Sequence, residues 1–237
     1  MKLETLRATL DSRGFALVPP LFEETRLAEL ADEIAALPHN AAIRERAGSR
    51  YGIRNLLSLS PCLRSMIVEP RVRALVETLV GKDARVVRSI FYDKTPRANW
   101  QVGWHQDTTI AVQRRIDVPG FRSWSIKAGV IHVQPPAEVL AQVLTMRIHL
   151  DVADEMNGAL AVIPGSHRRG FLSDEAVADC LRAQPQVLCS VPVGGVLLMR
   201  PLLLHASARA LNQARRRVVH LEWAASKLPG GLRWPTI

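Results

Sequence analysis

Apolar residues recur at helical spacing through the first third of the chain. Residues 3–12 and 22–37 each carry such a stripe, and residues 15–18 between them have the composition of a short strand. A third stripe, within residues 72–79, stops at Gly81, a residue type that commonly ends a helix. The N-terminal part is therefore expected to run helix, strand, helix, followed by one or two more helices.

The pattern changes after residue 84 to short runs rich in β-branched residues and bounded by glycine and proline. These runs predict strands near residues 85–93, 100–107, 143–151, 159–163, 187–191, 195–200 and 216–224, with a helix near 174–183. Residues 108–138 contain several glycines and prolines without a clear period, so a long connection that could serve as a lid is expected there. This spacing predicts a mainly β fold, a sandwich or barrel, with the N-terminal helices covering one face.

We expect one domain over residues 1–237, with helices in about 1–82 and the β core in about 84–225. The composition, 48% hydrophobic and 22% charged, is that of a folded globular protein. No apolar run approaches the roughly 18 residues that a membrane span requires. The N-terminus also lacks the apolar segment of a secretion signal. We therefore expect a cytoplasmic protein that does not contact membranes.

The net charge of +9 raises the question of an anionic partner. The arginines are spread along the chain, however, and the aromatic content of 5% offers few side chains on which bases could stack. We therefore favour a small molecule over nucleic acid as the partner.

The most distinctive local sequence is WHQD, in which His105 and Asp107 lie on a predicted strand. Side chains two residues apart on a strand project from the same face, so the two would converge. One imidazole and one carboxylate are two of the three ligands of a facial triad, which binds iron(II) and leaves positions open for oxygen and a co-substrate. The pair therefore predicts a metal site that needs a third ligand.

Six other histidines are candidates for that ligand. We favour His205, because it follows the apolar run LLMRPLLL and would lie at the end of a buried strand, where an imidazole requires a partner or a metal. His39 follows a helix and is expected to face solvent, and His167 lies in a Pro-Gly turn region. The remaining candidates, which could line the pocket or form hydrogen bonds in the core, are His132, His149 and His220.

The stretch RRRVVHLEWA alternates in the manner of a strand. Val219, Leu221 and Trp223 would form its apolar face, and Arg216 and His220 would lie on the opposite face. A guanidinium there could bind a carboxylate through two parallel hydrogen bonds. Arg216 is therefore a candidate anchor for an acidic ligand.

Three features together resemble the phytanoyl-CoA dioxygenase family of iron(II)/2-oxoglutarate-dependent oxygenases. They are WHQD, the segment NGALAVIPGSHRRG at residues 157–170, and His205 followed by Ser207 and Arg216. The resemblance covers about residues 84–225, and RGFALVPPLF near the N-terminus is similar to the usual opening of the family. It implies a double-stranded β-helix, or jelly roll, flanked by helices.

The same resemblance implies that His105, Asp107 and His205 bind iron(II). It also implies that Arg216, helped by Ser207, binds the distal carboxylate of 2-oxoglutarate. The expected enzyme uses O2 to hydroxylate a small organic molecule and releases succinate and CO2. Because related halogenases have a small residue at the position of Asp107, hydroxylation is favoured over halogenation.

Three further residues are expected to contact the substrate. Arg147 falls where relatives frequently carry a tryptophan close to the co-substrate, so it could contact either substrate or 2-oxoglutarate. Trp124 and His132 lie in the expected lid and would exclude water from the reacting bond. A pocket with Arg147 and Arg216 favours an anionic substrate. One departure from the family pattern is Ala206, where a glycine often follows the distal histidine.

Other functions remain as alternatives at this stage. A nucleic-acid-directed oxygenase would be retained on DNA or RNA in a salt-sensitive manner. A catalytically silent binding module on the same fold would bind no metal. A zinc hydrolase is a third alternative, because a facial triad does not itself select the metal, but the arginine at the 2-oxoglutarate position argues against it. The sequence indicates neither the substrate nor the oligomeric state.

Overall fold

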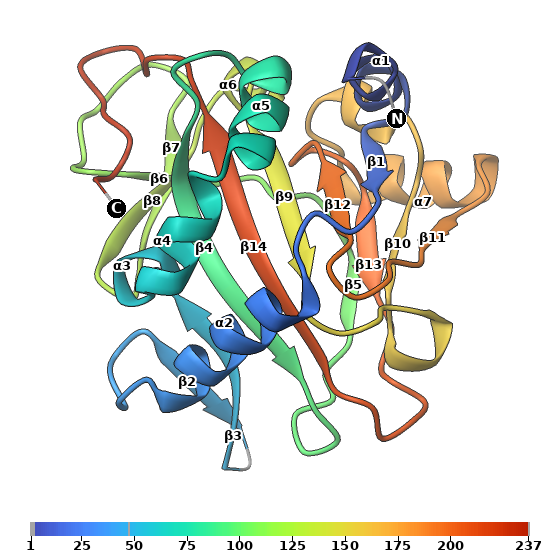
Figure 1. The fold of residues 1–237 in the computed structure, drawn as a ribbon. Helices are drawn as coiled ribbons and strands as arrows, with labels where there is room; N and C mark the ends of the chain where they lie inside the picture. The colour runs from blue at the N-terminus through green and yellow to red at the C-terminus, as the bar shows by residue number, and fades with distance from the viewer. Residues whose placement is uncertain (1–2, 47, 237) are drawn as a thin grey trace.

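The computed structural model describes residues 3–46 and 48–236. A seven-stranded sheet packs through one face against a four-stranded sheet (Figure 1). The strand order of the larger sheet is β1 (Phe15–Val18), β12 (Val196–Met199), β9 (Leu144–His149), β14 (Arg216–Ala224), β4 (Arg85–Lys94), β3 (Ser49–Arg54) and β2 (Ile43–Arg46). The smaller sheet has the order β11 (Val187–Cys189), β10 (Leu160–Val162), β13 (His205–Ser207) and β5 (Val102–His105). These pairs are all antiparallel, and the expected mainly β jelly roll is confirmed.

Alternation along β14 decides which side chains lie between the two sheets. Val219, Leu221 and Trp223 are buried in the main core, on the face of the sheet that the helices cover. Arg216 and His220 point the other way and line a cavity between the sheets. The two faces predicted for this strand are therefore those observed.

The helices that precede β4 cover the outer face of the larger sheet (Figure 1). They are α1 (Leu3–Arg13), α2 (Glu24–Ala36), α3 (Leu56–Leu59), α4 (Pro61–Ile67) and α5 (Pro70–Leu79). The start of α4 shows why they form where they do. Ser60 accepts a hydrogen bond from the amide of Leu63 at 2.9 Å, and Pro61 occupies the first turn. No helix in the described part of the chain has the length and apolar character needed to cross a bilayer.

Residues 108–138 are not the strand-free connection that the sequence predicts. They contain a third antiparallel sheet of β6 (Ile110–Val112), β8 (Val130–Gln134) and β7 (Arg122–Lys127), which α6 (Ala137–Ala141) follows. Ala128 and Gly129 join β7 to β8 with φ angles of +50° and +77°. A two-residue hairpin turn of this kind requires two positive φ angles, and alanine rarely adopts one. The prediction was wrong here because Ala128 gives no turn signal.

Several predicted strand ends also shift: β9 ends at His149 and β11 at Cys189, both two residues before the predicted end. A hairpin formed by β2 and β3 was not predicted. The strand expected over residues 100–107 ends at His105. The apolar run before His205 does not form one strand, because Pro201 has no amide hydrogen for the ladder and the chain turns after β12. His205 therefore begins β13 in the smaller sheet and does not end a strand of the larger one. The helix predicted near 174–183 is α7 (Asp174–Ala183).

Candidate metal centre and its pocket

Two histidines from neighbouring strands and one aspartate meet between the sheets. His105 ends β5 and His205 begins β13, and the two are direct partners across this strand pair. Their ring centroids lie 4.2 Å apart, and Nε2 of His205 is 3.8 Å from a carboxylate oxygen of Asp107. One potential ligand atom of each residue lies within 4.8 Å of the other two. The structure thus brings together the three residues predicted to bind a metal.

Main-chain carbonyls orient both imidazoles. Nδ1 of His105 lies 2.8 Å from the carbonyl oxygen of Gly103, and Nδ1 of His205 lies 2.8 Å from that of Leu203. At these distances Nδ1–H donates to the carbonyl, which leaves Nε2 of each ring without a proton. This tautomer presents Nε2 to a metal ion, and the carbonyl fixes the ring orientation.

The segment that carries Asp107 is anchored by its neighbour Gln106. The Gln106 side chain donates to the carbonyls of Gly170 at 2.9 Å and Leu202 at 2.7 Å, and it accepts from a main-chain amide at 2.9 Å. The amide of Asp107 donates to the carbonyl of Pro201 at 2.9 Å. The carboxylate is therefore held in place although the strand has already ended.

Charge at the site favours the metal-binding forms of these ligands. Burial alone would raise the pKa of Asp107, but the charges of His205, His220 and Arg88 outweigh burial and lower this pKa to about 2. Burial lowers the pKa of His205 to about 4, although the Asp107 carboxylate acts in the opposite direction. At neutral pH, Asp107 is a carboxylate and His205 a neutral imidazole, the states that metal ligation requires.

Arg216 and Ser207 line the same cavity, and the buried Lys94 contacts this Ser207. Arg216 donates from Nε to the carbonyl of Asn157 and from Nη2 to Oγ of Ser207, both at 3.2 Å. Nζ of Lys94 donates to the same Ser207 oxygen at 3.0 Å. Burial, followed by the neighbouring arginine charges, lowers the pKa of Lys94 to about 7, and burial, then Arg147, lowers that of Arg216 to about 9. Both cations are buried without a carboxylate partner among the described residues, an arrangement suited to an acidic ligand.

Gly158 allows the chain to pass close to this cluster. A capping box between Asp154 and Asn157 precedes it, and its φ is +73°. A Cβ atom there would lie 2.3 Å from the carbonyl oxygen of Ala208. Its own carbonyl accepts a hydrogen bond from Ser207 at 2.8 Å. Only glycine fits this position, and it fixes the hydroxyl that Arg216 contacts.

Residues 10–218 match the family model described as phytanoyl-CoA dioxygenase (PhyH). The chain belongs to the phytanoyl-CoA dioxygenase family. This confirms the resemblance that WHQD, His205 and Arg216 carried in the sequence.

Relatives within this family and solved structures extend the comparison. An ectoine dioxygenase from Bordetella bronchiseptica is 27% identical over 175 residues, which cover 68% of this chain and 47% of that protein. Phytanoyl-CoA dioxygenase domain-containing protein 1 from Mus musculus is 28% identical over 194 residues, covering 74% and 58%. The chain thus spans about half the length of these relatives. EctD from S. alaskensis with bound Fe shares the fold, with a TM-score of 0.72, 21% identity, and coverage of 95% of this chain and 77% of that one.

Arg147 of this family member lies in the cavity with the predicted ligands, which has a volume of about 110 Å³. It donates from Nη1 to Nδ1 of His220 at 3.0 Å, and its Nε has no partner among the described residues. Burial lowers the pKa of Arg147. Arg147 is 7% exposed and has no carboxylate partner in the described chain. Arg147 is thus placed to meet an anion in the pocket.

The other two predicted substrate residues lie in the third sheet. His132 of β8 is 3% exposed and lines a second cavity beside the first. Trp124 of β7 lines neither cavity; it packs on the apolar cluster beneath this sheet, with the Arg115 guanidinium 5.4 Å from its ring centroid. The structure therefore places neither residue in the lining of the cavity with the predicted ligands.

Sequence reasoning gave Lys94 no role, although its ammonium contacts Ser207 beside Arg216. Tyr92 and Trp100 also line the cavity and were not predicted. Lys94 is 1% exposed and shares a strand face with Tyr92. A lysine inside the largely apolar strand SIFYDK was the available signal, because a buried ammonium is costly unless it has a partner.

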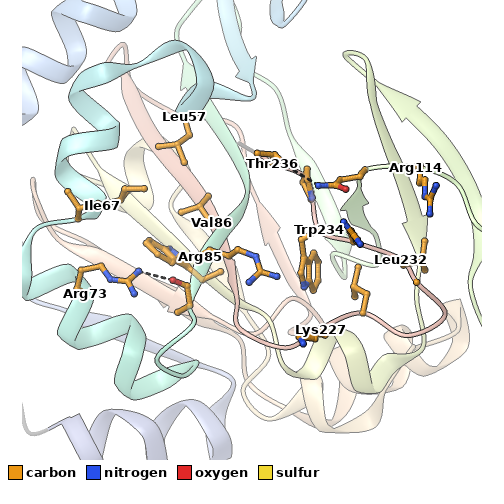
Figure 2. A pocket seen from close by; sticks show the side chains of 18 residues that line it. Leu57, Ile67, Arg73, Arg85, Val86, Arg114, Lys227, Leu232, Trp234 and Thr236 are labelled. Atoms are coloured by element: carbon orange, nitrogen blue, oxygen red, sulfur yellow. Dashed lines mark hydrogen bonds between the residues drawn. The ribbon is translucent and has the colours of Figure 1, made fainter.

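A cavity of about 890 Å³, larger than the one with the predicted ligands, is lined by Trp223 on the opposite face of the larger sheet (Figure 2). In Figure 2, Trp234 and Leu232 lie between Arg85 and Arg114, with Lys227 below them. None of the predicted metal ligands lines it. Size alone would therefore have selected the wrong cavity for the chemistry of this family.

Proposed function

We propose that the chain is an iron(II)- and 2-oxoglutarate-dependent dioxygenase that hydroxylates a small anionic organic molecule. One observation carries the proposal: a two-imidazole, one-carboxylate site and a buried arginine cluster line the same small cavity. Membership of the phytanoyl-CoA dioxygenase family supports it.

The donor set fits iron(II). His105, Asp107 and His205 would supply three ligands and leave positions open for a co-substrate and oxygen. Iron(II) bound there would activate O2 as 2-oxoglutarate is oxidised to succinate and CO2. The Nδ1 hydrogen bonds of both histidines hold the imidazoles ready for this ion, so little reorganisation is required on binding.

The distal carboxylate of 2-oxoglutarate would be bound by Arg216, Lys94 and Ser207. Arg216 and Ser207 line the cavity, and Lys94 donates to Oγ of this Ser207, so a carboxylate would meet donors that are in place. The neighbour EctD from S. alaskensis, 20% identical, has been solved with 2-oxoglutarate and 5-hydroxyectoine, which supports this use of the fold.

The charge in the cavity supports an anionic substrate. With iron(II) and 2-oxoglutarate bound, the positive charges of the metal, Arg216 and Arg147 would exceed the negative charges of Asp107 and the co-substrate by one, even if Lys94 is neutral. A carboxylate on the substrate would balance that excess, and Arg147 is the cation without a counterion. His132 and the third sheet would close this side of the pocket against water.

The test is iron-dependent release of labelled CO2 from 1-¹⁴C-2-oxoglutarate, measured with and without a panel of small organic acids. We expect a slow basal release that requires iron(II), a marked increase with at least one acid, and none in the Asp107→Ala protein. Release that is independent of iron, or equal in Asp107→Ala, would refute the proposal. A matched control is Asp117→Ala, which removes an exposed carboxylate paired only with Arg115.

A further inference from the structure

We call the cavity lined by His105, Asp107 and His205 the metal cavity. A second cavity lies beside it, and one buried ion pair lies between the two. Its volume is also about 110 Å³. Arg88 of β4 lines it and donates to Glu222 at 2.8 Å. Glu222 in turn lies 3.4 Å from Nε2 of His220, which lines the metal cavity. We name the second cavity the cationic recess, after its titratable lining residues Arg54, Arg88, Lys127 and His132.

Two of these cations have no counterion. In the described ranges, no side-chain carboxylate oxygen lies within 4.0 Å of a side-chain nitrogen of Arg54 or Lys127. Burial, and then the charge of Arg88, lowers the pKa of Arg54. Burial, and then Arg88 and Arg54, lowers the pKa of Lys127. The cations of the recess are therefore close enough to repel one another.

Glu222, the carboxylate that pairs with Arg88, is already occupied. It is 2% exposed and contacts both Arg88 and His220. Nε of Arg88 is buried without a partner among the residues described. His132 contributes no charge at neutral pH, since burial and Arg88 lower its pKa to about 4. Three cations thus line the recess with one carboxylate paired to Arg88, and the half-buried charges of Arg54 and Lys127 stay uncompensated until an anion binds.

We infer that the cationic recess binds an anionic group of the substrate between Arg54, Arg88 and Lys127, distinct from the carboxylate that Arg147 would balance in the metal cavity. The inference rests on the proposed function and narrows its substrate class. The two excess positive charges match a phosphate monoester or a pair of carboxylates better than a single carboxylate. The carbon to be oxidised would lie on the far side of the Arg88–Glu222 pair, towards His220 and the metal ligands.

The recess also disfavours other substrate classes. A neutral molecule would leave the charges of Arg54 and Lys127 uncompensated, and a cation would add to their repulsion. Arg54 comes from the end of β3 and Lys127 from the end of β7, two segments brought together only in the folded chain. Specificity would therefore reside in residues outside the motifs that hold iron and 2-oxoglutarate.

The first experiment measures binding of inorganic sulfate, as a dianion probe, by equilibrium dialysis. The protein is loaded with iron(II) and 2-oxoglutarate without O2, so that the Arg216 cluster is occupied, and the ionic strength is held constant. The variant is Arg54→Met/Lys127→Met, with Lys127→Met alone as the milder change if the double variant does not fold. The control, Arg7→Met/Lys82→Met, removes the same charges from exposed positions.

We expect one saturable sulfate site in the wild-type and control proteins, with at least tenfold weaker binding in the double variant and a smaller loss in Lys127→Met. Absence of a saturable site, or equal binding in recess and control variants, would overturn the inference. The visible charge-transfer band of bound 2-oxoglutarate is recorded in each protein. If the wild type lacks that band, the proposed function fails. Sulfate binding to the recess is then still measured by dialysis of the protein without iron and 2-oxoglutarate.

The second experiment compares phosphate monoesters and dicarboxylic acids with their neutral methyl esters as stimulators of CO2 release from 2-oxoglutarate. We expect stimulation by the acids, with a KM at least tenfold higher in the recess variant and a smaller change in kcat. Equal or greater stimulation by the neutral esters would overturn the assignment of the recess to the substrate.

Discussion

His105 and His205 face each other across the β5–β13 pair, and each donates from Nδ1 to the carbonyl two residues before it. The two strands come from segments 100 residues apart in the chain. Their antiparallel pairing sets the separation of the rings, and the local hydrogen bonds set the tautomers. The metal site is therefore built largely by the backbone of the smaller sheet.

Gln106 should matter for metal binding although it contacts no metal. In Gln106→Ala, three main-chain groups lose their partner, which we expect to cost about 1–3 kcal/mol of unfolding free energy. We also expect about 10-fold weaker iron(II) binding, because Asp107 loses its anchor. Iron(II) titration and urea unfolding measure the two effects. Gln142→Ala, at an exposed glutamine on the end of α6, is the control; an unchanged iron affinity in Gln106→Ala would contradict this role.

The arginine cluster predicts a specific loss of affinity for 2-oxoglutarate. Replacing Arg216 with Met should raise the KM for 2-oxoglutarate about 100-fold, since a buried charged hydrogen-bond partner is lost. Arg216→Lys should not restore it, because an ammonium lacks the planar fork. An Arg216→Lys protein with wild-type KM would contradict this assignment.

Lys94 should make the binding of 2-oxoglutarate depend on pH. Burial lowers its pKa to about 7, so the ammonium is lost as pH rises through 7 and the affinity for a dianion falls. We expect the KM for 2-oxoglutarate to rise between pH 6.5 and 8.5 in the wild type and to be flatter in Lys94→Met. An identical pH profile in both proteins would remove Lys94 from the site.

The sequence predicted the features that depend on residues close together in the chain, and it did not predict those that depend on residues far apart in the chain. The limits of α7 were predictable because its cap and apolar stripe are local, with Ser173 accepting from the amide of Ala176. The juxtaposition of His105 and Asp107 was predictable because both lie in one short motif. The contact that suggests a role for Lys94 was not predictable. Its partner Ser207 is 113 residues away, and only the folded chain brings the two together. The third sheet was missed because Ala128 gives no turn signal.

His132 should make the stability of the protein depend on pH. Its pKa in the folded chain, about 4, lies below the ordinary value of 6.5, chiefly because it is buried. The contribution of His132 to the free energy of unfolding is therefore complete above pH 6.5, and it is lost as the pH falls towards 4. Between pH 7.5 and 5 we expect the wild type to lose about 2 kcal/mol more unfolding free energy than His132→Gln. Urea unfolding at both pH values measures this, and parallel losses would contradict it.

Gly158 and Gly48 form a natural pair for testing close packing at the co-substrate cluster. Both have positive φ angles, +73° and +70°, but a Cβ meets the Ala208 carbonyl only at Gly158 and has open space at Gly48. Gly158→Ala should therefore destabilise the protein by about 2 kcal/mol more than Gly48→Ala and raise the KM for 2-oxoglutarate. Equal effects of the two substitutions would show that strain alone, without the clash, accounts for the loss.

The most direct test of the proposed activity is anaerobic titration of the iron(II)-loaded protein with 2-oxoglutarate, followed through its visible charge-transfer band. The band reports a keto acid chelated to iron at a site with open positions. We expect it to appear with one equivalent of iron per chain, to vanish in His105→Ala, and to require far more 2-oxoglutarate in Arg216→Met. A wild-type protein that binds iron(II) but shows no band, or a band unchanged in both variants, would contradict the assignment of this cavity to iron and 2-oxoglutarate.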